Sequence, residues 1–418
     1  MNWKAQILKI ISTNISKLIV LKYKPIVIAI TGNVGKSSTK EAIYTVVSKK
    51  YTVRKNELNF NTEIGVALTI MGVEQSGSSS ILTWLKHLLI GLKLLIKRQK
   101  NYPQVLILEY GADRPNDIKK LCNIARPDIS VVTNIGNIPV HIEYFNDIED
   151  VYTEKSNIIK MLKPSGTAIL NYDNEKIYNF RKLTKANIIS YGFDIKSDVH
   201  ISSYKIETKD DLLDSSMYMR FEYKNHFAPF EIKSVLGKGF AYAFMCAVSV
   251  GISLDMNLLD CLHALEDYQQ LPSRLNLISG IKNSYIFNDT YNASPLAVEN
   301  SLNLLGEFKN NRKVFVFGDM KELGNFSEKA HRLVAKQIID NDVKLFVAVG
   351  EKTLFTVEAL EKLGFDKNNI YHFKTSNDAR LKIQDLIYPS DIILIKGSHS
   401  MQMNIIAKEI AFEPDRIV

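Results

Sequence analysis

The chain has 418 residues, a formal net charge of +8 and three cysteines. Its length exceeds that of one ordinary domain, so two or three domains are expected. Cys122, Cys246 and Cys261 lack the spacing of a disulfide framework or a zinc ribbon, which favours a reducing, cytoplasmic setting. Ten of the basic residues fall in two segments without acids, 1–24 and 81–100, and the rest of the chain is slightly acidic. This distribution argues against nucleic acid as a partner.

The two basic segments are both expected to form amphipathic helices. In 1–24, isoleucines and leucines recur at helical spacing until Pro25 ends the pattern. In the second segment, one helix face is expected to collect Leu85, Leu88, Leu89, Leu92 and Leu95, with lysines opposite. Neither segment resembles a cleaved secretory signal, and the second, at about 16 residues, is short of the roughly 20 that cross a bilayer. Packing on the protein body and peripheral contact with a membrane both stay open for each helix.

The stretch from Ile26 to Glu41 predicts a phosphate-binding loop. The apolar run Ile26–Ile30 is typical of a buried parallel strand, and helical spacing begins at Ser38. The loop between them consists of Thr31, Gly32, Asn33, Val34, Gly35, Lys36, Ser37 and Ser38. Backbone N–H groups and the positive helix end would face an anion there. Lys36 would reach the β- and γ-phosphates, and the Ser37 hydroxyl could bind Mg²⁺.

Further strands are expected to bring polar residues to the same edge of the sheet. Val105–Leu108 ends in Glu109, and Ile129–Asn134 leads into the loop that contains His141. Ligands of open α/β sheets bind at the carboxyl ends of the strands. The phosphate loop, Glu109 and His141 are therefore expected to converge on one crevice.

The remaining pattern predicts an α/β fold in which a large, mostly parallel sheet precedes a smaller, Rossmann-like domain. The first part would also contain a strand at 167–171, antiparallel strands within 188–230 and helices within 239–265, with a Gly/Ser linker at 75–80. Beyond a boundary near 269–280, strands are expected at 314–317, 345–349, 370–373 and 392–395, and helices near 295–308, 327–340, 354–364, 376–387 and 401–412. The predicted units are 1–24, a basic helical segment; 25–272, an ATP-binding domain that includes the helix of 81–100; and 273–418, a carboxy-terminal domain.

Seven motifs in chain order resemble the Mur ligase family. They are T-G-N-V-G-K-S-S from Thr31, N-x-N-x-E-I-G-V from Asn59, L-E-Y-G-A-D from Leu108, T-N-I-G with H-I-E from Thr133, D-T-Y-N-A-S-P from Asp289, G-D-M-K-E-L-G from Gly318 and K-G-S-H-S from Lys396. The resemblance covers about residues 25–418 and is strongest to the branch that adds D-alanyl-D-alanine to a muramoyl tripeptide. It implies an enzyme of peptidoglycan synthesis with ATP as co-substrate, a muropeptide-type carboxylate and an amino-acid or dipeptide amine.

The family's chemistry implies how the first group of residues would act. ATP phosphorylates the carboxylate, and the amine attacks the resulting acyl phosphate, so the protein mainly positions groups and neutralises charge. By resemblance, Lys36 holds the β- and γ-phosphates, and Ser37 and Glu109 bind one Mg²⁺. Glu109, His141 and a carbamylated Lys155 would bind a second Mg²⁺, because CO₂ turns a repelling ammonium into a carboxylate-like ligand.

The resemblance also assigns residues beyond the boundary. Arg274, in P-S-R-L-N, would lie near the nucleotide phosphates, and Asp289 would contact the ribose. Asn292 belongs to the same nucleotide-binding loop. Lys396 would approach the phosphate when the domains close.

The chain departs from the family pattern in three places. Only the basic segment 1–24 and Pro25 precede the first strand, so the family's UDP-sugar-binding domain is expected to be missing. The segment 235–240, V-L-G-K-G-F, replaces G-[RK]-H-N, so a polar contact to adenine is not evident. His399 replaces the arginine of K-G-S-R, and Asn404 stands near an expected glutamate, which leaves the amine open.

Several functions therefore stay open at this stage. The acceptor could be lipid-linked, with the basic helices at a membrane. The chain could be the partner of an amidotransferase, although three scattered cysteines do not match the zinc insert of the lipid-II-amidating member. A non-catalytic nucleotide-binding protein is a third alternative, and D-T-Y-N-A-S-P disfavours a folylpolyglutamate-type ligase.

Overall fold

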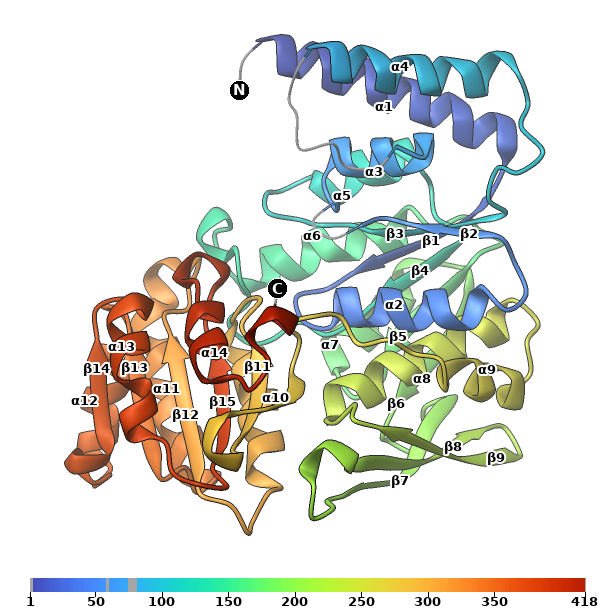
Figure 1. Ribbon diagram of the computed structural model, residues 1–418. Coiled ribbons are helices and arrows are strands. Elements are labelled where there is room, and N and C mark those ends of the chain that lie inside the picture. Colours follow the sequence, from blue (N-terminus) through green and yellow to red (C-terminus); the bar gives the residue numbers. More distant parts are fainter. Residues whose placement is uncertain (1–2, 58–59, 74–80, 418) are drawn as a thin grey trace.

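A computed structural model describes residues 3–57, 60–73 and 81–417. The described residues form two β-sheets flanked by helices, which stand next to each other with a cleft between them (Figure 1). Asn59 and the expected linker at 75–80 lie outside the described residues. The mixed α/β class and the order of the two domains are as predicted.

The first sheet has nine described strands in the order β2-β3-β1-β4-β5-β6-β7-β8-β9. Their bounds are β1 Ile26–Thr31, β2 Val53–Lys55, β3 Val105–Glu109, β4 Ile129–Val132, β5 Thr167–Asn171, β6 Asn187–Gly192, β7 Val199–Glu207, β8 Ser216–Tyr223 and β9 His226–Lys233. Pairing is parallel from β2 through β7 and antiparallel from β7 to β9. The antiparallel prediction for 188–230 therefore holds for its later part, and β6 extends the parallel sheet.

Helices cover both faces of this sheet, which is why β1 is apolar at consecutive positions. Ile28 and Ile30 face a core with α2 Lys36–Val47, α8 Lys238–Ser253 and α9 Leu258–Leu265. Val27 and Ala29 face a core with α3 Glu63–Met71, α5 Asp117–Ile124 and α6 Ile148–Lys160. The short α7 spans Glu175–Tyr178. The strand is thus fixed between two helical layers, with its carboxyl end leading into the phosphate loop.

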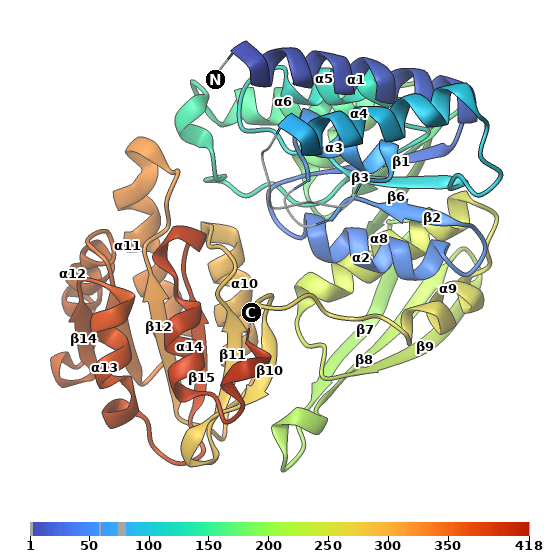
Figure 2. The ribbon, with the colours of Figure 1, turned by 45° about the horizontal axis from the view of Figure 1, so that its top comes forward.

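The two basic segments form an outer layer of helices. Helix α1 spans Trp3–Tyr23 and α4 spans Ile81–Ile96, and the two lie side by side over α3 (Figures 1 and 2). Both helices pack on the body through only one side, and much of their apolar surface stays exposed. Within the described ranges, no helix is long and apolar enough to cross a bilayer.

The structure shows which side of the second basic helix packs on the body, a point that the sequence left open. Leu88 and Leu95 are half-buried, but Leu85, Leu89 and Leu92 are exposed. The side of α4 that packs inward instead contains His87, Gly91 and Leu94. A Cβ at Gly91 would come within 2.7 Å of Ile15 of α1, so the small residue permits the close approach of the two helices.

The second sheet has six described strands in the order β10-β11-β15-β12-β13-β14. Its elements are β10 Asn276–Ser279, β11 Tyr285–Asp289, α10 Pro295–Gly306, β12 Lys313–Gly318, α11 Ser327–Asp340, β13 Leu345–Val349, α12 Leu354–Lys362, β14 Ile370–Phe373, α13 Ser376–Leu386, β15 Ile392–Lys396 and α14 Asn404–Ile410. All pairs are parallel except the first. The sequence analysis did not predict β10 and β11. The proposed boundary at 272/273 falls between α9 and β10 and stays a prediction.

Candidate active site

The phosphate loop joins the end of β1 to the start of α2. Gly32 has φ 144°, and a Cβ there would lie 2.0 Å from the Thr133 hydroxyl, so a side chain would clash with the neighbouring strand end. Gly35 has φ 84° at the N-cap of α2, a left-handed conformation that glycine adopts without strain. Asn33 and Val34 donate their backbone N–H groups to the carbonyl of Asn134, at 2.8 and 3.1 Å. The loop is thus fixed against the β4 loop, and the first turn of α2 presents its N–H groups to the cleft.

Ser37 and Glu109 meet beside Lys36, as predicted from the sheet topology. The Ser37 Oγ donates to Glu109 Oε2 at 3.1 Å. Glu109 is buried at the end of β3, where its N–H donates to the Asn56 side chain at 2.8 Å. Burial lowers the pKa of Lys36, and the charge of Glu109 opposes this shift. A hydroxyl and a carboxylate oxygen at this separation form a donor pair that suits a hard divalent cation.

His141 faces the same cleft from a strained turn. It adopts φ 64° and places Nε2 3.4 Å from Asp113 Oδ1 and Nδ1 3.0 Å from Glu322 Oε2. Burial lowers the pKa of His141, and the two carboxylates oppose this effect. Glu322 follows β12 in the second domain, so the histidine bridges carboxylates of both domains.

Lys155 lies in α6, behind the cleft rather than among the residues that line it. It is 3% exposed, and burial, followed by the charge of Lys36, lowers its pKa to about 7. Its neighbour Glu154 accepts hydrogen bonds from the N–H groups of Asn116 and Ile118, both at 2.7 Å, and so holds the start of α5. The lysine is therefore a buried amine of which about half is neutral near pH 7.

Arg274 reaches the phosphate loop from the segment between the two sheets. Its Nη2 lies 3.3 Å from Ser37 Oγ, and its guanidinium stacks on the Tyr291 ring at 3.6 Å from the centroid. Its Nε is buried and has no hydrogen-bond partner in the described structure. A stacked cation with an unused donor beside a phosphate loop is suited to an anionic ligand.

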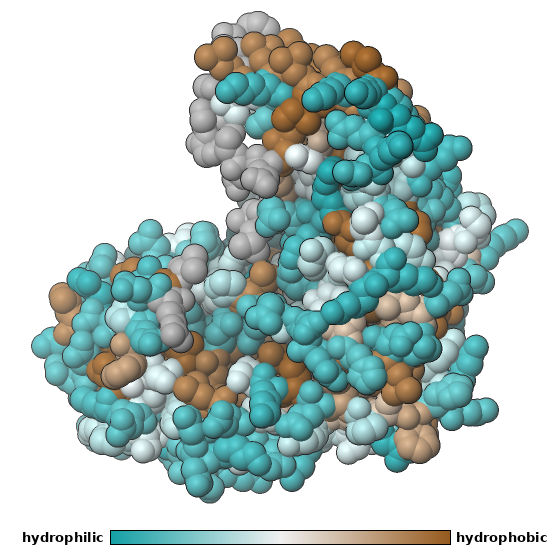
Figure 3. All heavy atoms as spheres, turned by 45° about the vertical axis from the view of Figure 1, so that its right-hand side comes forward, coloured by the Kyte–Doolittle hydropathy of each residue, from teal (hydrophilic) through white to brown (hydrophobic). Residues whose placement is uncertain are grey.

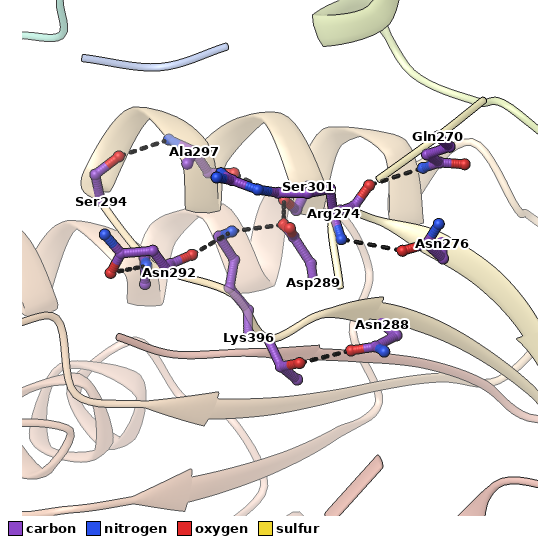
Figure 4. A network of polar contacts seen from close by, with 12 residues as sticks. Gln270, Arg274, Asn276, Asn288, Asp289, Asn292, Ser294, Ala297, Ser301 and Lys396 are labelled. Atoms are coloured by element: carbon purple, nitrogen blue, oxygen red, sulfur yellow. Dashed lines mark hydrogen bonds and ion pairs between the residues drawn. The ribbon is translucent and has the colours of Figure 1, made fainter. Parts of the chain in front are cut away.

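Asp289 and Lys396 form a buried ion pair at the ends of the neighbouring strands β11 and β15 (Figure 4). The Lys396 Nζ lies 2.5 Å from Asp289 Oδ2 and donates to the Asn292 carbonyl at 3.0 Å. Ser301 of α10 donates to the same carboxylate oxygen at 2.7 Å. Burial lowers the pKa of Lys396, and Asp289 opposes that shift. One carboxylate oxygen of Asp289 is thus occupied by protein donors.

A cleft of about 360 Å³ contains these groups from both domains. The predicted residues that line it are Asn33, Val34, Gly35, Lys36, Ser37, Ser38, Glu109, His141, Arg274, Asp289, Asn292 and Lys396. Gly237, Gly239 and Phe240 form its wall where the polar motif for adenine was expected. His399, the residue that departs from K-G-S-R, lies 5.8 Å from Tyr291 between ring centroids.

The sequence analysis missed three residues of this arrangement. Asp113 and Glu322 contact His141, and Tyr291 supports Arg274. All three belong to motifs noted in the sequence, but the motifs do not reveal which side chains meet across the cleft. In the described part of the chain, no group of three or more His, Cys, Asp or Glu side chains has the arrangement of a metal site. Two of the predicted metal ligands, Ser37 and Lys155, are not His, Cys, Asp or Glu and so do not count toward such a group.

A Lys-Ser phosphate loop at the end of a parallel sheet, opposite a second α/β domain, defines a two-domain protein of the P-loop nucleotide-binding class. Residues 30–251 match the Mur ligase middle domain, and residues 273–399 match the Mur ligase, glutamate ligase domain. The chain belongs to the Mur ligase family.

Named relatives and solved structures agree with this assignment. The UDP-N-acetylmuramoyl-tripeptide–D-alanyl-D-alanine ligase of Bacillus subtilis (strain 168) is 27% identical over 390 residues, which cover 93% of this chain and 76% of the relative. The fold is similar to MurF from Acinetobacter baumannii, with TM-score 0.78, 23% identity, and 96% and 79% of the two chains covered. It is also similar to MurF ligase from Thermotoga maritima in complex with ADP, with TM-score 0.76, 22% identity, and 95% and 82% covered.

Proposed function

We propose that this protein is an ATP-dependent, ADP-forming ligase that adds D-alanyl-D-alanine to a muramoyl tripeptide. The proposal rests on the contact between the Ser37 hydroxyl and Glu109 beside Lys36, in a cleft whose other wall contributes Arg274. The relatives named for this reaction match 76% of their own length, which supports the substrate assignment. We place the reaction in the cytoplasm, in line with three buried, unpaired cysteines.

The side chains of the cleft suit Mg²⁺. Ser37 and Glu109 would hold one ion, since their oxygens already lie 3.1 Å apart. Glu109, His141 and a carbamylated Lys155 would hold a second, once His141 releases one of its two carboxylate partners. A pKa of about 7 leaves about half of Lys155 near pH 7 as the free amine that reacts with CO₂. Bound Mg²⁺ would neutralise phosphate charge during transfer.

The remaining residues position the reactants. The Lys36 ammonium would pair with the β- and γ-phosphates, and Arg274 would direct its unused Nε–H and its charge at the transferred group. An oxygen of the substrate carboxylate attacks the γ-phosphorus, and ADP leaves. The amine then attacks the acyl carbon and releases phosphate, which yields the peptide bond and a proton. Asp289 and Asn292 would orient the ribose, and Asp289 holds the Lys396 ammonium at the cleft wall.

ADP release tests this proposal. The purified chain would be assayed with ATP and Mg²⁺ against UDP-linked muramoyl tripeptide, with and without D-alanyl-D-alanine. We expect ADP release only when acceptor and dipeptide are both present, together with a product that gains the dipeptide mass. Equal ADP release without the dipeptide, or no release with any muropeptide, would contradict the assignment.

A second candidate is the same ligation on a lipid-linked acceptor. The exposed apolar, lysine-rich surface of α1 and α4 favours this candidate, because a lipid-linked acceptor is presented at a membrane. The assay above, repeated with lipid-linked muropeptide in detergent, separates the two: the preferred acceptor is the one with the higher kcat/KM. An amidotransferase partner would instead require glutamine and a second protein.

A further inference from the structure

The outer surface of α1 and α4 exposes an unusual number of large apolar side chains. On α1 the exposed residues are Ile7, Ile10, Ile11, Leu18 and Leu21, which recur along one side of the helix. Ile15 and Ile19, on the neighbouring side of the helix, are buried against the body. We call the exposed side of both helices the α1–α4 face. It appears as a continuous apolar band along the top of the molecule (Figure 3).

Helix α4 continues the α1–α4 face. Its exposed apolar residues follow one another at steps of three and four positions. They are Leu82, exposed by 72%, Leu85 by 50%, Leu89 by 63%, Leu92 by 42% and Ile96 by 85%. Single exposed leucines are common on proteins, but a contiguous stripe over two adjacent helices marks a binding surface.

Unpaired basic residues flank this stripe. Seven basic residues here are exposed, and none of them forms an ion pair with another described residue. They are Lys17, Lys24, Lys86, Lys93, Lys97, Arg98 and Lys100. Two other lysines have structural partners: Lys9 pairs with Glu63 at 2.6 Å, and Lys22 donates to the carbonyls of Leu94 and Leu95 at the end of α4. Segments 1–24 and 81–100 contain no acid. The face is therefore apolar and uniformly cationic.

We propose that the α1–α4 face docks peripherally on an anionic lipid surface. Amphipathic helices with apolar and Lys-rich sides bind the membrane interface through buried apolar area and attraction to acidic headgroups. A second copy of the chain is a poorer occupant, because pairing through the same face would bring Lys86, Lys93 and Lys97 of both copies together without an acid to compensate. Because neither helix is long and apolar enough to span a bilayer, the contact lies in the plane of the interface.

Docking would fix how the cleft is oriented relative to the membrane. Asn61 lines the cleft, and Glu63, two residues later, begins α3 and pairs with Lys9 of α1. Helix α3 thus connects the cleft wall to the docking surface. This proposal does not depend on the ligase assignment, since binding to vesicles can be measured without substrate.

Vesicle binding tests the apolar part of the face. The probe is a vesicle of phosphatidylcholine with and without 30 mol% phosphatidylglycerol. Both tryptophans of the chain lie in these helices, so a blue shift of their emission reports binding alongside sedimentation. Leu85→Ser/Leu89→Ser should lower binding at least tenfold. The matched control is Leu354→Ser/Leu381→Ser, which changes two exposed leucines of the second domain and should not alter binding.

Charge reversal tests the electrostatic part. Lys86→Glu/Lys93→Glu/Lys97→Glu should weaken binding to anionic vesicles about 100-fold. The control Lys362→Glu/Lys374→Glu/Lys382→Glu changes net charge equally on the second domain and should have a much smaller effect. Wild-type binding should fall as salt rises, since added ions screen the attraction.

The results of these experiments distinguish membrane docking from self-association and from the ligase assignment. Binding that needs anionic lipid, falls with salt and is lost only in the α1–α4 variants supports docking. No binding to anionic vesicles would overturn it, as would a stable dimer that Leu85→Ser/Leu89→Ser converts to a monomer without any effect on vesicles. ADP release with soluble acceptor should be unchanged in these variants, so a failed docking experiment leaves the ligase assignment intact.

Discussion

The buried ion pair at the ends of β11 and β15 allows a quantitative prediction. Lys396 is 2% and Asp289 8% exposed, and their charged atoms are 2.5 Å apart. Lys396→Met would leave the Asp289 carboxylate buried with Ser301 as its remaining side-chain partner. Removal of one member of such a pair leaves an uncompensated buried charge, which typically costs about 3–5 kcal/mol. We therefore expect Lys396→Met to lower the free energy of unfolding by that amount.

The double variant Lys396→Met/Asp289→Asn separates the energy of the ion pair from the cost of burying each charge. It removes both charges at similar volume, so its loss should be clearly smaller than the sum of the two single losses. The exposed pair of Lys344 and Asp342 has the same charged-atom distance of 2.5 Å and provides the control. Lys344→Met should change stability by no more than about 1 kcal/mol, because exposed pairs contribute little.

Urea unfolding followed by far-UV circular dichroism measures these differences. The midpoints are compared between variants with the same denaturant slope. In Asp289→Asn, Lys396 stays buried without its carboxylate, and burial keeps its folded-state pKa below that of the unfolded chain. The unfolded state then binds more protons, so this variant should regain stability as pH rises toward the usual lysine pKa. A loss below about 1 kcal/mol for Lys396→Met, or strict additivity of the two changes, would refute the assigned coupling.

Further predictions concern the cleft. Lys36→Ala and Glu109→Ala should each abolish ADP release while the far-UV spectrum is retained, and full activity in either would refute the proposed phosphate and metal site. Lys155→Ala, or removal of bicarbonate, should lower activity, and a small added carboxylate should restore part of the variant's loss. With ¹³C-bicarbonate, a carbamate signal should appear at pH 8 and fade at pH 6, since the pKa of about 7 leaves the amine protonated at the lower pH. A Lys155→Ala enzyme as active as the parent would remove the carbamate from the mechanism. Arg274→Ala should reduce kcat/KM for ATP about 10- to 150-fold, the equivalent of about 1.5–3 kcal/mol for a charged hydrogen bond. Arg274→Lys should recover little, because it cannot stack as a plane on Tyr291; full recovery would show that charge alone suffices.

The sequence predicted those strands that are buried on both faces of the sheet. Strands β1, β3 and β4 are covered on both faces, and consecutive apolar residues revealed them. Strands β10 and β11 were missed because they carry polar residues such as Asn276 and Asp289, and β10 lies at the edge of its sheet. The side on which α4 packs stayed open in the sequence for a related reason. Apolar spacing locates a helix but does not show whether its apolar side faces the core or solvent.

The sequence predicted contacts of the site within the first domain but not those between the two domains. Parallel strands put Glu109 beside the phosphate loop, because both follow neighbouring strands of one sheet. The partners of His141 were not predictable in this way, because Glu322 comes from the second domain and meets it only after the domains assemble. Similarly, the stacking of Arg274 on Tyr291 depends on how the inter-sheet segment folds back.

These interdomain contacts suggest how the cleft is assembled before ligand binds. Arg274 already touches Ser37, and Glu322 already touches His141, so the second domain supplies a charged group to two proposed metal ligands of the first domain. A cation held by Ser37 would take over the Oγ lone pair that now accepts from Arg274. A second cation held by His141 through Nδ1 would require that nitrogen to lose its proton and to release Glu322. Arg274 would then be free to turn to phosphate oxygens, and Glu322 would lose its partner. The same contacts that hold the two domains together without ligand are therefore the ones that nucleotide and metal must exchange, which couples ligand binding to the position of the second domain.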